Sequence, residues 1–467
     1  MKRNNVLPEA FEITNGYPAL EAVSKIYDEL DYQRAVQSYL WAMPAVACYS
    51  FIQGLKRDYQ ADMYTVNIWQ KSATPVTRVL TGNSQSIYAV GYFDLAETGP
   101  MVLEFPPNVL GMIDDLWYAP VSDVGIAGPD KGKGGKYLIL PPGYQGETPD
   151  GYFTFTSTTN LNIWLVRGFK GQDGSSPVAS LKKMQFYPLD RAEDRPQMTY
   201  KLVSDIPADL TFPTDERFFE AMGAIFSQEA VRDRDMAYLG MLQSLGIEHG
   251  KPFAPDDRLQ AIFKKAAATG EAMARTLSFS SRNPNKNPYP DRQWEWIFLT
   301  DRPDFYAANY LDIEARVSYT FQACFTANAM VVQLVGAGSQ YLAAFKDSRG
   351  EWLDGAKLYK LTLPPDVPVE NFWSLMVYSS ETRSMVVTDT HKAGVDSYGR
   401  VRANEDGSIN LYVGPEPPPG MESNWVKTNA DEGFFVYLRF FGPKQAFFDK
   451  TWVPGDLEPV SALQADL

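Results

Sequence analysis

The sequence predicts an α+β protein that is mostly β, with two β-sandwich or jelly-roll-like domains, an N-terminal helical segment and a helical insert between the domains. Aromatic residues make up 13% of the 467 residues, and aromatic and β-branched side chains favour strands. Glycine (34) and proline (33) are frequent, as in proteins with many short strands joined by turns. Helical periodicity is confined to the N-terminal segment and the middle of the chain.

The N-terminal segment, 1–60, is predicted to be helical. Its apolar residues recur at helical spacing on one stripe, which consists of Leu20, Val23, Ile26, Tyr27 and Leu30, followed by Val36, Leu40 and Trp41. Pro44 lies in the same stretch. Because proline lacks a backbone donor and clashes with the preceding turn, we expect it to interrupt the helix.

The first β domain is predicted over 61–204. Short β-prone runs alternate with Gly, Pro, Asn and Asp at the spacing typical of a sandwich or barrel. The expected strands are 86–95, 101–105, 110–117, 136–140, 151–156 and 161–169. The glycine- and lysine-rich stretch 128–136 does not have P-loop spacing, and a strand follows it, so a hairpin loop is favoured over a phosphate cradle. An anion-binding nest of its backbone N–H groups is the alternative.

Residues 205–335 are predicted to form a helical connecting segment. Helical spacing occurs in three sets: Phe218, Phe219, Met222, Ile225 and Phe226; Leu259, Ile262, Phe263 and Ala266; and Tyr306, Tyr310, Ile313, Val317, Phe321 and Cys324. The third set predicts one buried helix face that includes Cys324. Exposed apolar stripes are unfavourable in water, so we expect 215–334 to pack against both β domains.

The second β domain is predicted over 336–467. Its expected strands are 341–345, 358–363, 372–378, 408–413 and 434–441, separated by turns such as the Asp406–Gly407 pair.

Composition excludes several classes of protein. The formal net charge is −14, which repels phosphate backbones, so neither nucleic-acid binding nor attraction to anionic membranes is expected. Apolar runs stay well short of the ~20 residues of a membrane helix, and the N-terminus lacks the apolar core of a signal peptide. We therefore expect a soluble protein, cytoplasmic or periplasmic, with no membrane span; a signal peptide removed beforehand stays open.

Cys48 and Cys324 are the only two cysteines of the sequence. This number excludes a disulfide framework and a zinc site built on cysteine spacing. Two free buried thiols are favoured over a single bridge between them.

Candidate catalytic residues are Asp115 and Asp123, which flank Trp117. Paired carboxylates beside an aromatic ring are typical of carbohydrate-processing clefts, and turn-forming or salt-bridged aspartates are the alternative. The two histidines, His249 and His391, lie in loop-like sequence, and no nucleophile elbow accompanies them. The sequence implies neither a metal site nor a cofactor.

Candidate ligand-binding residues are three arginines and two tryptophans. Strand alternation places Arg167 on one face with Leu165, and Arg439 on one face with Tyr437 and Phe441. An unpaired charge among apolar side chains is costly, so each guanidinium must meet a carboxylate, carbonyl groups or an anionic ligand. Arg383 is a third candidate for the same anion, and Trp117 and Trp425 are candidate aromatic contacts for a ligand.

Several long segments carry a family resemblance. The stretch NSQSIYAVGYFDL (83–95), then GPMVLEFPP (99–107) and residues 114–153, resemble the domain of unknown function numbered 1254. The segments 341–355, 371–385 and GFFVYLRFFGP (433–443), with the sequence onward to 460, resemble its usual companion, the domain numbered 1214. The resemblance implies two β-sandwich units with helical decoration, bacterial origin and homo-oligomers, but no agreed activity.

Two hypotheses about function remain. The first is a hydrolase-like enzyme that acts on a small organic, anionic or carbohydrate-like ligand in a cleft between the β domains. The second is a non-catalytic ligand-binding or self-assembling protein. Edge strands of sandwiches need covering, so we expect a closed homo-oligomer in either case.

Overall fold

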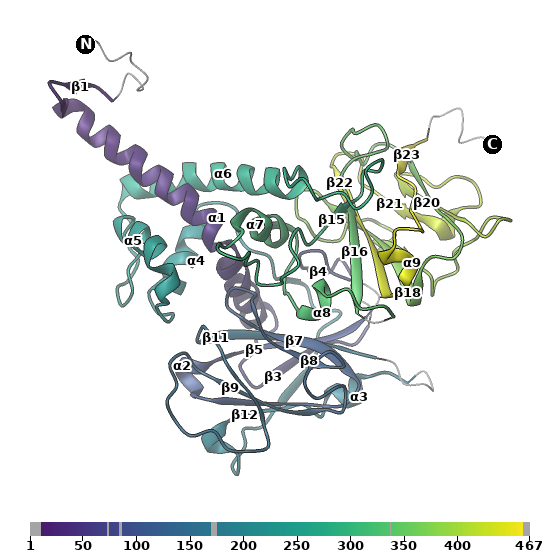
Figure 1. Ribbon diagram of the computed structural model, residues 1–467, viewed down its shortest axis with the longest axis horizontal. Coiled ribbons are helices and arrows are strands. Elements are labelled where there is room, and N and C mark those ends of the chain that lie inside the picture. The colour runs from purple at the N-terminus through teal and green to yellow at the C-terminus, as the bar shows by residue number, and fades with distance from the viewer. Residues whose placement is uncertain (1–10, 72–73, 84–85, 170–174, 337, 461–467) are drawn as a thin grey trace.

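The computed structural model describes residues 11–71, 74–83, 86–169, 175–336 and 338–460. The structure is α+β with more strand than helix, as the sequence predicts. Figure 1 shows one β domain below, the second at the upper right, and the helices above the first domain and beside the second.

One long helix, α1 (Val23–Asp58), leads from the N-terminal arm into the junction between the two domains (Figure 1). It follows a small hairpin of β1 (Ile13–Thr14) and β2 (Tyr17–Pro18) and a 3-10 turn, Leu20–Ala22. The predicted interruption at Pro44 is wrong, because α1 continues through it. Residues 41–48 are all buried, so packing around the proline maintains the helix against the cost of the lost bond. The first part of the predicted stripe is exposed instead, with Leu20 at 90% and Tyr27 at 61%.

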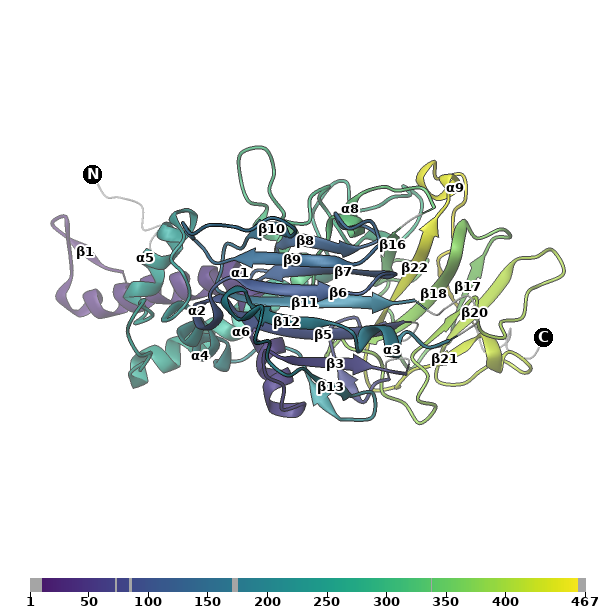
Figure 2. The ribbon, with the colours of Figure 1, turned by 90° about the horizontal axis from the view of Figure 1, so that it is seen from below.

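The first β domain consists of two sheets. The six-stranded sheet has the order β13 (Thr199–Leu202), β3 (Thr65–Trp69), β5 (Ile87–Asp94), β11 (Leu161–Gly168), β7 (Val109–Asp115) and β8 (Pro120–Gly125). The four-stranded sheet has the order β10 (Phe153–Thr156), β9 (Gly135–Leu140), β6 (Met101–Phe105) and β12 (Gln185–Pro188). Both sheets are seen face-on in Figure 2. The pairs β13–β3 and β10–β9 are parallel, and the other neighbours are antiparallel.

The core of this domain lies between its two sheets. Trp164 of β11 is fully buried, and its ring lies 4.8 Å from that of Phe186 and 6.0 Å from that of Phe105, both on the other sheet. The opposite face of the six-stranded sheet is also covered, because Val90, Met112 and Ile163 belong to the large core shared with the helices and the second domain. The sheet is therefore buried on both faces.

The stretch 128–136 is not the hairpin loop that we expected. It joins β8 to β9, which belong to different sheets, so it crosses from one layer to the other. Asp130 fixes its conformation by accepting hydrogen bonds from the Gly134 N–H (2.9 Å) and the Tyr137 hydroxyl (2.7 Å). Smaller elements complete the domain: α2 (Leu95–Thr98), α3 (Val178–Leu181), the 3-10 turn Leu189–Arg191, and the parallel pair β4 (Thr77–Arg78) and β14 (Ala208–Asp209).

The connecting segment is helical in several pieces. They are α4 (Arg217–Phe226), a 3-10 turn (Asp233–Asp235), α5 (Met236–Ser244), α6 (Asp257–Phe279), α7 (Ile313–Gln322) and α8 (Asn328–Val331). The predicted helix face from Tyr306 to Cys324 is too long. The Asp312 side chain caps α7 by accepting from the Ala315 N–H, Tyr310 before it is 61% exposed, and Cys324 lies beyond its end.

The connecting segment contacts both β domains. The Thr326 N–H donates to Asp114 Oδ2 in the first domain at 3.0 Å. Arg275 Nη1 of α6 donates to the Ser380 carbonyl of the second domain at 2.7 Å.

The second β domain is also built from two sheets. One has the order β15 (Glu295–Trp296), β16 (Ser339–Ala344), β22 (Phe434–Pro443), β18 (Val369–Ser379) and β19 (Gly394–Asp396). The other has the order β21 (Trp425–Lys427), β20 (Ile409–Gly414), β17 (Tyr359–Leu363) and β23 (Leu457–Pro459). A 3-10 turn (Glu422–Asn424) and α9 (Gln445–Phe448) lie between strands. The rings of Tyr359 and Phe434, 5.7 Å apart, join the two sheets in the core.

None of the helices in the described part of the chain combines the length and the apolar character needed to cross a membrane.

Candidate functional site

A cavity of about 190 Å3 lies where the two β domains meet. Its walls come from β5, β7 and β11 of the first domain and from β16 and β22 of the second. Residues of the segments 77–83 and 323–330, and Phe51 of α1, also line the cavity, together with Trp69, Ile297, Phe298, Tyr319 and Gly338. The junction between the domains, a common place for ligand sites, is therefore hollow.

The wall from the first domain follows from strand register. Arg167 on β11 is paired with Tyr88 on β5 and with Leu110 on β7, and all three line the cavity. One pair further along, Leu165 and Met112 also line it. Residues two apart on a strand share a face, so this face carries one row with a cation and a second row that is apolar.

The wall from the second domain has a matching pattern. Tyr341 of β16 is paired with Arg439 of β22, and Ser339 is paired with Phe441. All four side chains line the cavity. The two predicted arginines, Arg167 and Arg439, thus reach one cavity from opposite domains.

Arg439 is a buried cation whose hydrogen-bond partners, within the described part of the chain, are neutral groups. The residue is 7% exposed to solvent. Its Nη2 donates to the Thr81 carbonyl at 2.6 Å and to the Tyr378 hydroxyl at 2.7 Å. Its Nε has no hydrogen-bond partner in the described part of the chain. The guanidinium also lies 5.6 Å from the ring centres of Tyr341 and Tyr437, which stabilises a cation modestly.

Arg167 is held by aromatic rings. Its guanidinium lies 4.5 Å from the ring centre of Phe169 and 5.1 Å from that of Phe441 on the second domain. Among the described residues, neither Arg167 nor Arg439 forms an ion pair with a carboxylate. Two positive charges therefore face the cavity of a protein whose net charge is −14.

Burial keeps two other titratable groups of the lining, Tyr341 and Cys324, neutral near pH 7. Burial raises the pKa of Tyr341, although Arg439 pulls it back partly. Burial also raises the pKa of the Cys324 thiol to about 12, with the Asp114 carboxyl adding to the effect. The thiol is therefore protonated, and its reactivity as a nucleophile is low.

Asp114 lies behind one wall of the cavity. Asp114 is paired with Ile163, two residues along the strands from the pair of Met112 and Leu165. Its Oδ2 accepts a hydrogen bond from the Thr326 N–H. Its Oδ1 has no partner in the described part of the chain, and burial raises the pKa of the carboxyl well above its usual range. Burial therefore favours the protonated form of the Asp114 carboxyl.

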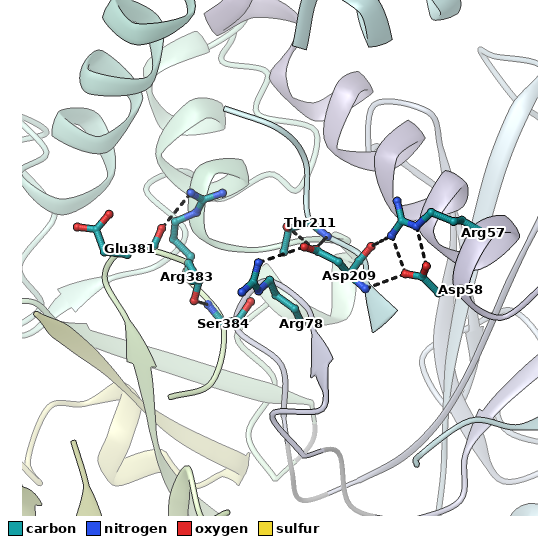
Figure 3. Close-up of polar contacts among 9 residues, drawn as sticks. Arg57, Asp58, Arg78, Asp209, Thr211, Glu381, Arg383 and Ser384 are labelled. Atoms are coloured by element: carbon teal, nitrogen blue, oxygen red, sulfur yellow. Dashed lines mark hydrogen bonds and ion pairs between the residues drawn. The ribbon is translucent and has the colours of Figure 1, made fainter. Parts of the chain in front are cut away.

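Arg383 lies outside the lining of the cavity. Figure 3 shows its guanidinium bonded to the Glu381 backbone, next to the chain of polar contacts from Arg57 to Arg78. Its Nε donates to the Phe321 carbonyl at 3.1 Å, and the group lies 4.5 Å from the Phe321 ring centre. Burial lowers the pKa of Arg383 to about 10. Its partners are two carbonyls and the rings of Phe321 and Phe212.

The carboxylate candidates also lie outside the lining. Asp115 Oδ1 accepts the N–H groups of Trp117 (2.8 Å) and Ala119 (3.0 Å), and Oδ2 accepts the Thr158 hydroxyl. These are the contacts of a turn-forming aspartate. Asp123 lies on β8 opposite Met112, and burial raises its pKa.

The two tryptophan candidates have protein contacts of their own. Trp117 is buried, and its ring lies 4.4 Å from the guanidinium of Arg232 and 5.3 Å from that of Arg316. Trp425 lies on the edge strand β21 and donates to the Gly414 carbonyl at 2.9 Å. The structure therefore brings two of the predicted ligand-binding residues together, Arg167 and Arg439, and leaves the others elsewhere.

Sequence reasoning did not select Tyr88, Tyr341 or Cys324, which line the cavity with the arginines. For Tyr341 and Tyr88 a signal existed, because both lie in expected strands and share the alternation of apolar neighbours. For Cys324 the sequence contains no such signal, since the position of this residue depends on where α7 ends. No group of three or more metal-ligating side chains occurs in the described ranges.

Comparisons with known proteins agree with the two-domain arrangement. Residues 63–188 match the family model described as a protein of unknown function (DUF1254), and residues 338–445 match a second such model (DUF1214). No curated protein matched the sequence.

Two solved structures are similar to the chain. The crystal structure of the VPA0106 protein from Vibrio parahaemolyticus has a TM-score of 0.55 at 17% identity, and the match covers 92% of this chain and 100% of that one. A putative uncharacterized protein from Burkholderia cenocepacia matches with a TM-score of 0.43 at 12% identity, over 96% of this chain and 99% of that one. The first likeness supports the fold and gives no activity.

Proposed function

The chain belongs to the family of proteins of unknown function in which a DUF1254 domain is followed by a DUF1214 domain, and from its cavity we propose that it binds a small organic anion between the two domains. The observation that carries this proposal is Arg439. It is a buried cation that lines a cavity, and among the described residues its Nε–H has no partner and its hydrogen-bond acceptors are neutral.

When the cavity holds only water, the Arg439 guanidinium is a buried charge with an unsatisfied hydrogen-bond donor, which is unfavourable. Leaving a buried donor unsatisfied costs about 1–3 kcal/mol, and more for charged groups. An anion in the cavity would satisfy Arg439 and would also lie beside Arg167, whose guanidinium has only aromatic contacts in the described part of the chain. Arginine suits this role because it stays charged and offers several donors in one plane.

Binding is better supported than hydrolysis. The lining residues supply cations, hydroxyl groups and apolar surface, and the pKa of the Cys324 thiol, about 12, keeps it protonated. The acid–base candidates Asp115 and Asp123 lie elsewhere. Hydrolysis by this chain stays a prediction, and turnover of small esters by the purified protein would be the sign of it.

The binding proposal can be tested by titration calorimetry with benzoate, hexanoate and inorganic phosphate. We expect at least one of them to bind to the wild-type chain, and Arg439→Met and Arg167→Met each to weaken that binding by roughly 10- to 100-fold, the value of one charged hydrogen bond. Arg383→Met is the matched control, because it removes another largely buried arginine that does not line the cavity.

Two results would overturn the proposal. One is the absence of binding of all three anions at millimolar concentration. The other is equal binding by wild type, Arg439→Met and Arg167→Met. Self-association is a separate prediction, and light scattering of the wild-type chain at high micromolar concentration tests it by the mass of the particle.

A further inference from the structure

The lining of the cavity changes from polar to apolar along the strands of the first domain. Arg167 and Leu110 form one pair on β11 and β7, and Leu165 and Met112 form the next. Strands rise about 3.3 Å per residue, so the second pair lies about 7 Å from the first. The following pair includes Asp114 and lies about 13 Å from Arg167.

Apolar groups line the end of the cavity remote from Arg167. The Thr326 N–H is bonded to Asp114, so the residues on either side, Phe325 and Ala327, cover this end, and both line the cavity. The Phe325 ring meets the Phe51 ring edge-on, with centres 5.2 Å apart.

The tyrosine hydroxyl groups near this end are already engaged by the protein. The Tyr319 hydroxyl donates to the Phe325 carbonyl. The Tyr437 hydroxyl donates to Gln322 Oε1 at 2.7 Å. A ligand that extends from the arginines towards Phe325 therefore meets mainly carbon atoms.

From this gradient, and resting on the proposed anion site, we infer that the ligand is an organic acid with one anionic group and an apolar body. The anionic group lies between Arg167 and Arg439, and the body extends over Leu165 and Met112 towards Phe325. A cavity of about 190 Å3 is comparable to an engineered apolar cavity of ~150 Å3 that binds benzene, which suits a body of several carbon atoms.

The same lining disfavours more polar acids. A hydroxyl group or a second carboxylate on the body would lose its hydration against Met112 and Phe325 without gaining a partner, and burying such a group unpaired is costly. Sugar acids and dicarboxylates of the same length should therefore bind less well than the simple acid.

A series of acids tests this inference by calorimetry on the wild-type chain. From acetate through butyrate to hexanoate, we expect Kd to fall about fourfold for each added methylene. Adipate and gluconate, which have the same six carbons as hexanoate, should bind at least about tenfold more weakly. Met112→Gln, which places an amide at the apolar end, should weaken hexanoate about tenfold and leave acetate within about twofold.

The outcomes separate this inference from the proposed function. If none of the acids binds, the anion site itself is wrong. If the acids bind in a manner that depends on Arg439 and Arg167, but Kd does not fall with chain length or gluconate equals hexanoate, the anion site stands and the apolar body is refuted. Should Met112→Gln fail to fold, the series on the wild-type chain decides alone.

Discussion

Replacing Arg167 by methionine should leave the stability of the fold nearly unchanged. The guanidinium has no hydrogen bond or ion pair among the described residues, and its contacts are the rings of Phe169 at 4.5 Å and Phe441 at 5.1 Å. Each such contact contributes about 0.5–1 kcal/mol, so about 1–2 kcal/mol is lost. Methionine regains roughly 1 kcal/mol by burying its own apolar surface. The net change in the free energy of unfolding should therefore be within about 1 kcal/mol.

Arg383→Met is the matched comparison, because this arginine is buried but fully engaged by the protein. Its replacement leaves the Phe321 and Glu381 carbonyls without their donors. Hydrogen bonds from a charged group contribute about 1.5–3 kcal/mol each, and release of the buried charge offsets part of the loss. We expect a net destabilisation of about 2–4 kcal/mol.

Thermal unfolding followed by near-UV circular dichroism can distinguish the two variants. Because the entropy of unfolding grows with chain length, one kcal/mol shifts Tm by roughly 1 °C for a chain of this size, so Arg383→Met should melt a few degrees below Arg167→Met. If Arg167→Met melts as far below wild type as Arg383→Met, then Arg167 is a structural residue, and its assignment to a ligand site is wrong.

Two further predictions concern buried acids. Burial raises the pKa of Asp114, so the folded state holds a proton that the unfolded state releases above about pH 4. The wild-type protein should therefore lose stability as pH rises from the pKa of Asp114 in the unfolded state to its pKa in the folded state. The free energy of unfolding should fall by up to about 1.4 kcal/mol per pH unit in this window. Asp114→Asn should remove this slope, and denaturant unfolding at several pH values checks it; parallel curves for the two proteins would contradict the assignment. Because the pKa of Cys324 is about 12, iodoacetamide at pH 8 should modify this thiol about a thousandfold more slowly than a free cysteine, as followed by mass spectrometry. Rapid modification of the native protein at Cys324, with full modification in denaturant as the control, would show that the pKa of this half-buried thiol is not raised.

Strand positions could be predicted well from the sequence because their signal is local. All eleven expected strands are present, with ends that differ by at most three residues. Short strands such as β3, β19 and β23 were missed, because a run of three to five residues carries little periodicity. Helix ends were predicted less well. Helix α7 begins after the N-cap at Asp312, so Tyr306 and Tyr310 lie before the helix although they fit its apolar spacing. The position of a cap decides such a boundary, and apolar spacing alone cannot.

Close packing between distant segments could not be predicted. Gly91 lies on β5 opposite Trp164, and a side chain there would come within 2.5 Å of the indole ring. The sequence contains this glycine in the middle of an apolar strand and gives no reason for it. The reason is the width of a ring on the neighbouring strand, and that is known only once β5 and β11 are paired.

The candidate site, too, could be predicted only as far as local sequence patterns reach. Alternation within one strand was enough to find Arg167 and Arg439 as charges on apolar faces. Whether each guanidinium lies next to a carboxylate, a carbonyl group or a shared cavity depends on segments that are distant in the sequence. Arg383 met the carbonyl of Phe321 and Arg439 that of Thr81, yet only Arg439 lines a hollow.

The connecting segment decides that difference. Phe325 and Ala327 follow α7 and form one wall of the cavity, and the Thr326 N–H is fixed by Asp114 of the first domain. The two domains also confine the arginines directly, because Arg439 donates to the Thr81 carbonyl of the first domain and Arg167 lies 5.1 Å from the Phe441 ring of the second. An anion gains little from a hydrated arginine and much more from a confined one, because the effective dielectric constant falls with burial. Each arginine is confined by groups from the other domain, and Phe325 and Ala327 of the connecting segment add a further wall, which is why neither β domain alone is expected to bind the acid.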